Sequence, residues 1–145
     1  MPQRFELDVT SEMKNLMVIS DFIASVAGEL DLDEDQTFSV QMAVDEACAN
    51  VIEHAYGGRA DGMLRIACEV VNDEVVVTIH DHGRPFDPRG VLRPDIAAPL
   101  EKRPEGGLGL FLMEKLMDSI EFKFNAVEGN VLTMRKGKRH EKPSL

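Results

Sequence analysis

Residues 46–56, EACANVIEHAY, decide the fold of this chain because they complete its longest stretch of helical periodicity. That stretch begins near residue 34, after an Asp33 and a Gln36 spaced as in a capping box. Gly57-Gly58 follows it as a terminator. The pattern predicts one long helix over residues 34–56. Its core-facing stripe consists of Val40, Val44, Ala47, Val51 and Ala55.

A neighbouring face of this predicted helix is polar. At about 100° per residue, Glu46, Asn50, Glu53 and His54 fall together on it. Glu46 and Asn50 are one turn apart, so their side chains can converge. An amide oxygen can ligate Mg²⁺, and a carboxylate beside it can accept a proton from an attacking hydroxyl. The alternative is a solvated helix face, which explains Asp45 and Glu53 better than Glu46, while His54 fits a helix-end cation near the dipole.

The segments around this helix supply strands and further helices. An alternating strand is expected over 3–9, then a helix capped by Thr10 or Ser11 and ending near Gly28. The apolar stripe of that helix is Leu16, Ile19, Ile23 and Val26. The remaining expected elements are strands over 63–71 and 74–80, a helix over 109–118, and strands over 119–125 and 130–136.

This order of elements predicts an α+β fold: a two-layer sandwich with a mixed, mostly antiparallel sheet covered on one face by helices. Residues 1–136 are expected to form one domain, followed by a polar tail over 137–145. Residues 84–105 carry five prolines and are long for a connection, which favours a lid or binding segment.

Composition excludes several classes of protein. The chain has 145 residues, 43% of them hydrophobic, and a net charge of −10. Such an acidic domain disfavours nucleic-acid binding. No apolar run reaches membrane-spanning length and no signal peptide is present, so a cytoplasmic location is expected. Cys48 and Cys68 lack metal-ligand spacing and are expected to be buried and reduced.

Two further segments suggest a binding site. Asp81-His82-Gly83 ends a strand, where a carboxylate can accept a hydrogen bond from an exocyclic amine and a glycine permits close approach of a flat ring. An ordinary strand-ending turn is the alternative. Glu105-Gly106-Gly107-Leu108-Gly109 precedes an apolar helix, where backbone N–H groups can surround an anion. A flexible hinge explains this second segment equally well.

These three segments, in this order, resemble the ATP site of the GHKL superfamily of DNA gyrase, histidine kinases and mismatch-repair ATPases. EACANVIEHAY resembles its N box, DHGRPFDP its first glycine box and EGGLGLFLMEKLMD its second. Within the superfamily, the sequence looks most like the bacterial anti-sigma serine kinases. The resemblance covers about residues 5–136.

The resemblance implies a role for each matching residue. Asn50 would ligate Mg²⁺, Glu46 would be the general base, and Asp81 would bind the adenine amine with Gly83 beneath the ring. The ATP phosphates would lie against the glycine segment, formed by Gly106, Gly107, Leu108 and Gly109. On the last hairpin, Asn130 or Thr133 would add adenine contacts. Lid cations that could reach phosphate are Arg89, Arg93, Lys102 and Arg103, although a solvated lid explains them equally well.

The implied function is Mg-ATP-dependent phosphorylation of a serine or threonine on a STAS-type antagonist protein, within an anti-sigma or partner-switching system. A sigma factor is a further possible partner, and a homodimer is a possible assembly. The alternative is a non-catalytic ATP-binding module that sequesters a sigma factor or another partner, because motifs report a site and not turnover. A histidine-kinase catalytic fragment is disfavoured by the absence of a phospho-acceptor segment.

Overall fold

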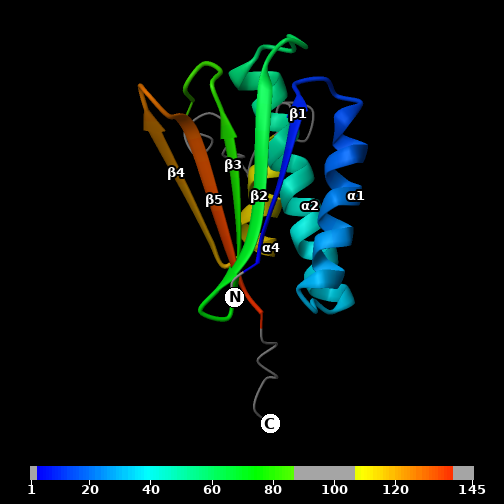
Figure 1. Ribbon diagram of the computed structural model, residues 1–145. Helices are drawn as coiled ribbons and strands as arrows, with labels where there is room; N and C mark the ends of the chain where they lie inside the picture. Colours follow the sequence, from blue (N-terminus) through cyan, green and yellow to red (C-terminus); the bar gives the residue numbers. More distant parts are fainter. Residues whose placement is uncertain (1–2, 87–106, 139–145) are drawn as a thin grey trace.

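A computed structural model describes residues 3–86 and 107–138, which form two layers, a sheet and the helices that cover one of its faces (Figure 1). The α+β sandwich predicted from the sequence is confirmed. The helices are α1 (Asn15–Glu29), α2 (Glu34–Asn50), the π-helical turn η1 (Val51–Ala55) and α4 (Gly107–Leu116). The strands are β1 (Arg4–Thr10), β2 (Met63–Val71), β3 (Glu74–Asp81), β4 (Ser119–Asn125) and β5 (Gly129–Gly137).

The five strands lie in the order β1-β2-β3-β5-β4, and all four neighbouring pairs among these described strands are antiparallel. The β2–β3 hairpin turns at Asn72 and Asp73, whose φ angles of 52° and 63° lie in the left-handed region. Two positive φ values in succession are typical of a tight hairpin turn, and asparagine and aspartate tolerate them. The predicted turn is therefore confirmed.

The core lies between the helices and one face of the sheet. In β3, buried residues alternate with half-buried ones, as expected when only one face is covered. The predicted stripe of the long helix is buried along its whole length. Side chains on the inner sheet face that are almost fully buried include Leu64, Ile66, Val77, Ile79 and Met134.

The first helix begins later than predicted. Neither Thr10 nor Ser11 caps it, because α1 starts at Asn15 after a Lys14 that makes no side-chain cap. The Ser11 hydroxyl instead accepts a hydrogen bond from the Gly62 N–H at 2.9 Å and donates one to the Arg59 carbonyl. Ser11 therefore joins the end of β1 to the loop before β2.

The long helix begins as predicted but ends with a different winding. Asp33 and Gln36 form the capping box, with Gln36 N–H donating to Asp33 Oδ1 at 2.7 Å. After Asn50 the helix widens into η1, and the Tyr56 N–H bonds the Val51 carbonyl at 3.1 Å, five residues back. Such π turns are frequent at functional sites. Gly57 and Gly58 then leave the helix with φ values of 61° and 81°.

Two smaller features concern cysteines and membranes. Cys48 and Cys68 are both free and buried, and burial raises the pKa of the Cys68 thiol to about 12.

Within the described ranges, no helix has the length and apolar character needed to cross a bilayer. Strand β5 extends one residue past the expected domain end at 136, while residues 139–145 of the expected tail lie outside the described residues.

Gly129, at the start of β5, is expected to tolerate no side chain. Its φ is 88°, and an added Cβ would overlap the Asp81 carbonyl oxygen and lie 2.7 Å from His82 Nδ1. We expect Gly129→Ala to lower the free energy of unfolding by about 2 kcal/mol or more, measured by urea denaturation. Gly28→Ala is the control, since nothing lies within 4 Å of its added Cβ. In that helical position alanine should stabilise by roughly 0.5 kcal/mol, and equal effects of the two variants would contradict this reading.

Candidate functional site

A small cavity lies between the helical layer and the inner face of the sheet. The space in it that a water-sized sphere can occupy is about 10 Å³. Its lining comes from α2 with η1, β3, the segment after β3, α4, β4 and β5, so both layers of the fold contribute. The lining residues are Ala47, Asn50, Val51, Asp81, Phe86, Met113, Phe122 and Leu132.

The polar side of this cavity is a hydrogen-bonded cluster around Asp81. The carboxylate oxygen Oδ1 accepts from Asn130 Nδ2 at 2.7 Å and from the Gly83 N–H at 2.8 Å. Asn130 Nδ2 also donates to the Gly83 carbonyl at 3.2 Å. Asp81 and Asn130 are directly opposite each other in the β3–β5 register, and they are 3% and 1% exposed. The cluster is therefore built by strand pairing.

Burial raises the pKa of the Asp81 carboxyl, because desolvation disfavours its charged form. The hydrogen bonds from Asn130 and Gly83, and the nearby imidazoles of His80 and His82, act in the opposite direction. A ligand that donates a hydrogen bond to Asp81 would stabilise the ionised form further. The site is thus suited to a neutral donor such as an amine.

In the part of the chain that the structure describes, the buried polar atoms without a hydrogen-bond partner are Asn50 Nδ2, His54 Nε2 and Asn130 Oδ1. Asn50 itself is only 4% exposed. Unsatisfied polar atoms are rare in native interiors, since each forfeits its hydration. The orientation of the Asn130 amide follows from its two donated bonds, so Oδ1 is the free acceptor.

Glu46 lies on α2 one turn before Asn50, is half-buried, and is not part of the cavity lining. Burial raises the pKa of its carboxyl, and the negative charges of Asp45 and Glu53 raise it further. A carboxylate with a raised pKa is a better proton acceptor at neutral pH than an ordinary one. Glu53 is exposed, in agreement with a solvated role.

The metal that the family resemblance implies is Mg²⁺, with Asn50 as its expected ligand. In residues 3–86 and 107–138, no group of three or more His, Cys, Asp or Glu side chains could hold an ion. Mg²⁺ typically takes only one or two protein ligands and completes its shell with waters and phosphate oxygens. The unsatisfied atom of the buried Asn50 side chain is the donor Nδ2, so the atom that would ligate Mg²⁺ is instead the amide oxygen Oδ1.

The glycine segment is only partly described. Gly107, Leu108 and Gly109 open α4, two residues earlier than the predicted helix start, so their backbone N–H groups belong to a first helical turn. Such N–H groups lack intrahelical partners. Gly106 lies outside the described residues, as do nearly all of the expected lid and its cations Arg89, Arg93, Lys102 and Arg103.

Gly83 packs against the end of the long helix. A Cβ on Gly83 would lie 2.6 Å from the Ala55 carbonyl oxygen, and the next N–H, that of Arg84, donates to this oxygen at 2.7 Å. The residue therefore permits close approach of two backbones. This contact does not test the expectation that Gly83 lies beneath an adenine ring.

Thr133 does not line the cavity and lies on the other face of β5. It alternates along β5 with the buried Leu132 and Met134, which face the helices. Its neighbours in the register are Thr78 and Glu121. Because side chains alternate between sheet faces, Thr133 points away from the cavity that Asp81 lines.

The apolar wall of the cavity was not identified from the sequence. The Phe86 ring lies 5.6 Å from the His54 ring and 6.1 Å from the Phe122 ring, measured between centroids. Met113 and Leu132 add apolar surface. The inward positions of Phe122 and Leu132 could have been read from strand alternation, whereas Phe86 lies inside the DHGRPFDP segment, where it was given no role. An aromatic wall opposite a polar cluster is a lining suited to a flat heterocycle, and the cavity of about 10 Å³ would have to widen to admit one.

Comparison with known proteins places these features in a family context. The family described as "Histidine kinase-like ATPase domain" matches residues 9–136. The serine-protein kinase RsbW of Halalkalibacterium halodurans is 33% identical over 139 residues, covering 93% of this chain and 83% of the relative. A serine-protein kinase RsbW of Bacillus cereus is 30% identical over 138 residues, covering 92% of this chain and 84% of the relative.

A solved structure shares the fold. The crystal structure of the RsbU and RsbW domains of Rv1364c from Mycobacterium tuberculosis superposes with a TM-score of 0.67 at 15% identity. The match covers 93% of this chain and 32% of that longer one. At this identity the likeness concerns the fold alone.

The electrostatic environment of Glu46 can be tested directly. We expect NMR titration of its carboxyl carbon to give a pKa above that of an ordinary glutamate. Glu53→Gln removes one repelling charge, so the pKa of Glu46 should fall, and Asp45→Asn should lower it likewise. Asp21→Asn, on α1, serves as the control because the charge of Asp21 is not among those that raise the Glu46 pKa. If both substitutions leave the pKa of Glu46 unchanged, the charges of Asp45 and Glu53 are screened and do not act on it.

Proposed function

Because the chain belongs to the histidine kinase-like ATPase family, among the bacterial anti-sigma serine-protein kinases, we propose that it is a Mg-ATP-dependent protein kinase. Its proposed substrate is a serine or threonine hydroxyl of a STAS-type antagonist protein. A sigma factor is a second proposed partner, bound in the alternating manner of a partner-switching system. The kinase domain is proposed to span residues 1–136 and to act in the cytoplasm.

The observation that supports nucleotide binding is the pair of acceptors at Asp81 and Asn130. The exocyclic amine of adenine carries two hydrogens, and the cluster offers a buried carboxylate beside the unsatisfied Asn130 Oδ1. Guanine presents a carbonyl oxygen at the equivalent position, which would face these acceptors unfavourably. The aromatic wall formed by Phe86 and Phe122 supplies apolar contact for the ring.

The phosphate end of the site is proposed to lie between Asn50 and the start of α4. Asn50 would hold Mg²⁺, which supplies charge neutralisation for the phosphate oxygens when bound. The first-turn N–H groups of α4, at Gly107, Leu108 and Gly109, would receive phosphate oxygens, with Gly106 preceding them. An acidic chain needs such neutral donors to hold a polyanion.

Glu46 would orient the partner's hydroxyl and accept its proton. In the transfer, a bond forms between the hydroxyl oxygen and the γ-phosphorus, and the bond from the γ-phosphorus to the β–γ bridging oxygen breaks, so ADP leaves. Phosphoryl transfer depends mainly on positioning and charge stabilisation. The raised pKa of Glu46 makes the carboxylate a stronger base for this step.

One observation favours the non-catalytic alternative. Glu46 is absent from the lining of the cavity that Asn50 and Asp81 share. A nucleotide could therefore be bound without a base at the reacting phosphate, and the domain would then sequester its partner stoichiometrically. Nucleotide binding is common to both functions, and phosphate transfer separates them.

Transfer from labelled ATP to a purified STAS-domain protein tests the kinase proposal. We expect the wild type to label the partner and Glu46→Ala to reduce the rate by about 100-fold or more, while ATP affinity stays within about twofold. Glu34→Ala, which removes an exposed glutamate on α2 whose charge is not among the causes of the raised Glu46 pKa, is the control and should retain most activity. Undiminished transfer by Glu46→Ala would overturn the assignment of the base. A wild type that binds ATP and retains its partner without labelling it would favour sequestration.

Asp81→Asn tests recognition of the base. The amide oxygen at position 81 can still accept from Asn130 and Gly83, but its NH₂ replaces the acceptor offered to adenine. We expect ATP affinity to fall about 100-fold, and GTP affinity to rise relative to ATP, in isothermal titration calorimetry with Mg²⁺. Asp8→Asn, which alters an exposed carboxylate on β1 paired with Arg65, is the control. Unchanged ATP affinity in Asp81→Asn would remove the basis for placing adenine here.

A further inference from the structure

We infer that Tyr56 is a positioning residue of the proposed nucleotide site, with its hydroxyl fixing the turn after Asp81 against the helix that carries Asn50. The inference rests on the proposed function, because it assigns a role in nucleotide binding. Tyr56 does not line the cavity, so any effect on the nucleotide must pass through other residues.

The Tyr56 hydroxyl uses its full hydrogen-bonding capacity on backbone groups. It donates to the Met63 carbonyl at 2.6 Å and accepts from the Met63 N–H at 3.3 Å and the His82 N–H at 2.9 Å. A hydroxyl has one donor and two acceptor positions, and all three are occupied here. A single side chain thus joins the end of η1 to the first residue of β2 and to the residue directly after β3.

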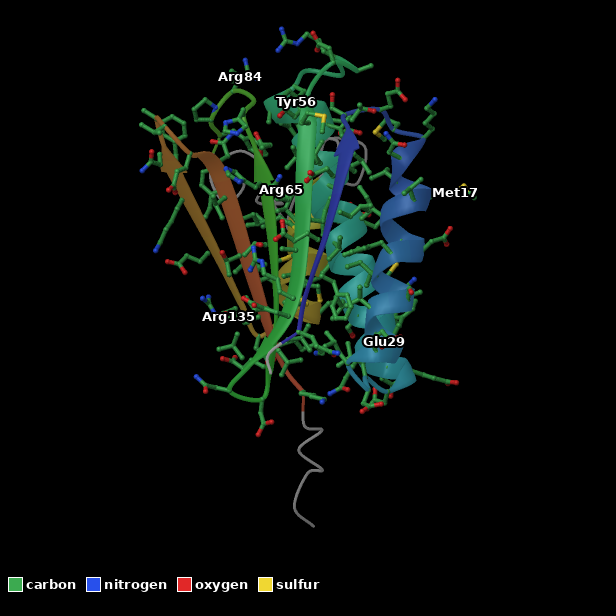
Figure 2. All side chains as sticks on the ribbon, in the orientation of Figure 1. Met17, Glu29, Tyr56, Arg65, Arg84 and Arg135 are labelled. Atoms are coloured by element: carbon green, nitrogen blue, oxygen red, sulfur yellow. The ribbon has the colours of Figure 1, made fainter. Side chains whose placement is uncertain are left out.

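The same turn is also held by the helix backbone. The Ala55 carbonyl accepts from the Arg84 N–H at 2.7 Å, and Gly83 approaches Ala55 closely enough to exclude a Cβ. Figure 2 shows Tyr56 and Arg84 at the same end of the molecule. The residues on either side of Gly83 are therefore both bonded to the end of the helix. His82 N–H donates to the Tyr56 hydroxyl, and Arg84 N–H donates to the Ala55 carbonyl.

The Tyr56 ring is itself held in one position. It is 6% exposed, and a Cβ on Gly62 would overlap it. Gly62 is fixed in turn by its N–H bond to Ser11 Oγ at 2.9 Å. The hydroxyl consequently sits on a rigid support, as a positioning group requires.

The geometry explains why a nucleotide would depend on this contact. Asn50 comes from the helical layer and Asp81 from the sheet, while a single nucleotide must reach both. Gly83, which donates to Asp81 Oδ1, lies between the two residues whose backbones are bonded to Tyr56 and Ala55. Loss of the hydroxyl would free the His82 N–H and allow the Gly83 donor to move relative to Asp81, at a cost to base binding.

Tyr56→Phe removes the hydroxyl and keeps the ring. We expect MgATP affinity, measured by calorimetry, to fall about tenfold and the preference for ATP over GTP to narrow. The transfer rate at saturating ATP should stay within about twofold, because Glu46 and Asn50 do not depend on the hydroxyl. Gln36→Ala is the control, since it removes buried hydrogen bonds to the Gly137 and Lys138 carbonyls, away from the cavity. It should lower stability without altering ATP affinity.

Tyr56 is the only tyrosine and the chain has no tryptophan, which provides a second measurement. Intrinsic tyrosine fluorescence of the wild type reports this residue alone and should change when MgATP is added. Replacement of Tyr56 with 3-fluorotyrosine by biosynthetic labelling keeps the fold and weakens the hydroxyl as an acceptor. ATP affinity of the labelled protein should fall severalfold. If Tyr56→Phe does not fold, the ATP affinity of the fluorotyrosine protein tests the role of the hydroxyl instead.

The outcomes separate the two hypotheses. A wild type that shows no association with MgATP at millimolar concentration overturns the proposed function and this inference together. A wild type that binds ATP, with Tyr56→Phe or the fluorinated protein binding equally well, overturns the role of Tyr56 alone. A loss of affinity in the Gln36→Ala control equal to that in Tyr56→Phe would reduce the effect to general stability and also overturn it.

Discussion

One oxygen atom, Oδ1 of Asp81, accepts hydrogen bonds from Asn130 on the neighbouring strand and from the Gly83 backbone that continues its own strand. The carboxyl group is nearly fully buried, so without these donors its charge would be strongly disfavoured. The arrangement exists only because β3 and β5 pair with Asp81 opposite Asn130. A slip of one residue would turn one of the two side chains to the other face of the sheet. The hydrogen-bonded cluster around Asp81 therefore forms only in this strand register.

The second requirement is that one helix both packs into the core and carries the candidate binding residue Asn50. The stripe from Val40 to Ala55 packs on the sheet, yet Asn50, one residue from that stripe, is buried with an unsatisfied amide. The π turn at η1 follows directly after Asn50 and brings Tyr56 to the start of β2. The same helix thus contributes to the core and to the candidate site. Hydrogen bonds from Tyr56, and not only apolar contacts, join its end to the sheet.

The charge distribution sets the electrostatic problem for an anionic ligand. Between residues 15 and 53 the chain has no lysine, arginine or histidine, and its acidic side chains there lie on α1, α2, η1 and the connection between the first two helices. A polyphosphate beside this layer gains no attraction from these side chains. In the proposed site, backbone N–H groups at the start of α4 and a cation at Asn50 would offset that lack, because both attract phosphate oxygens without a basic side chain.

The sequence alone determined the two-layer fold, the capping box, the tight turn at Asn72 and Asp73, and the family, because periodicity, turn chemistry and ordered motifs are local signals. It also indicated Asn50, Asp81 and Asn130, which the structure brings to one cavity or to its polar edge. Only the tertiary structure decided that Thr133 faces away, that Ser11 braces a loop instead of capping a helix, and that Phe86 and Phe122 form an aromatic wall. These outcomes depend on strand register and on which distant segments meet, and no local pattern of residues encodes a contact between elements that are far apart in the chain.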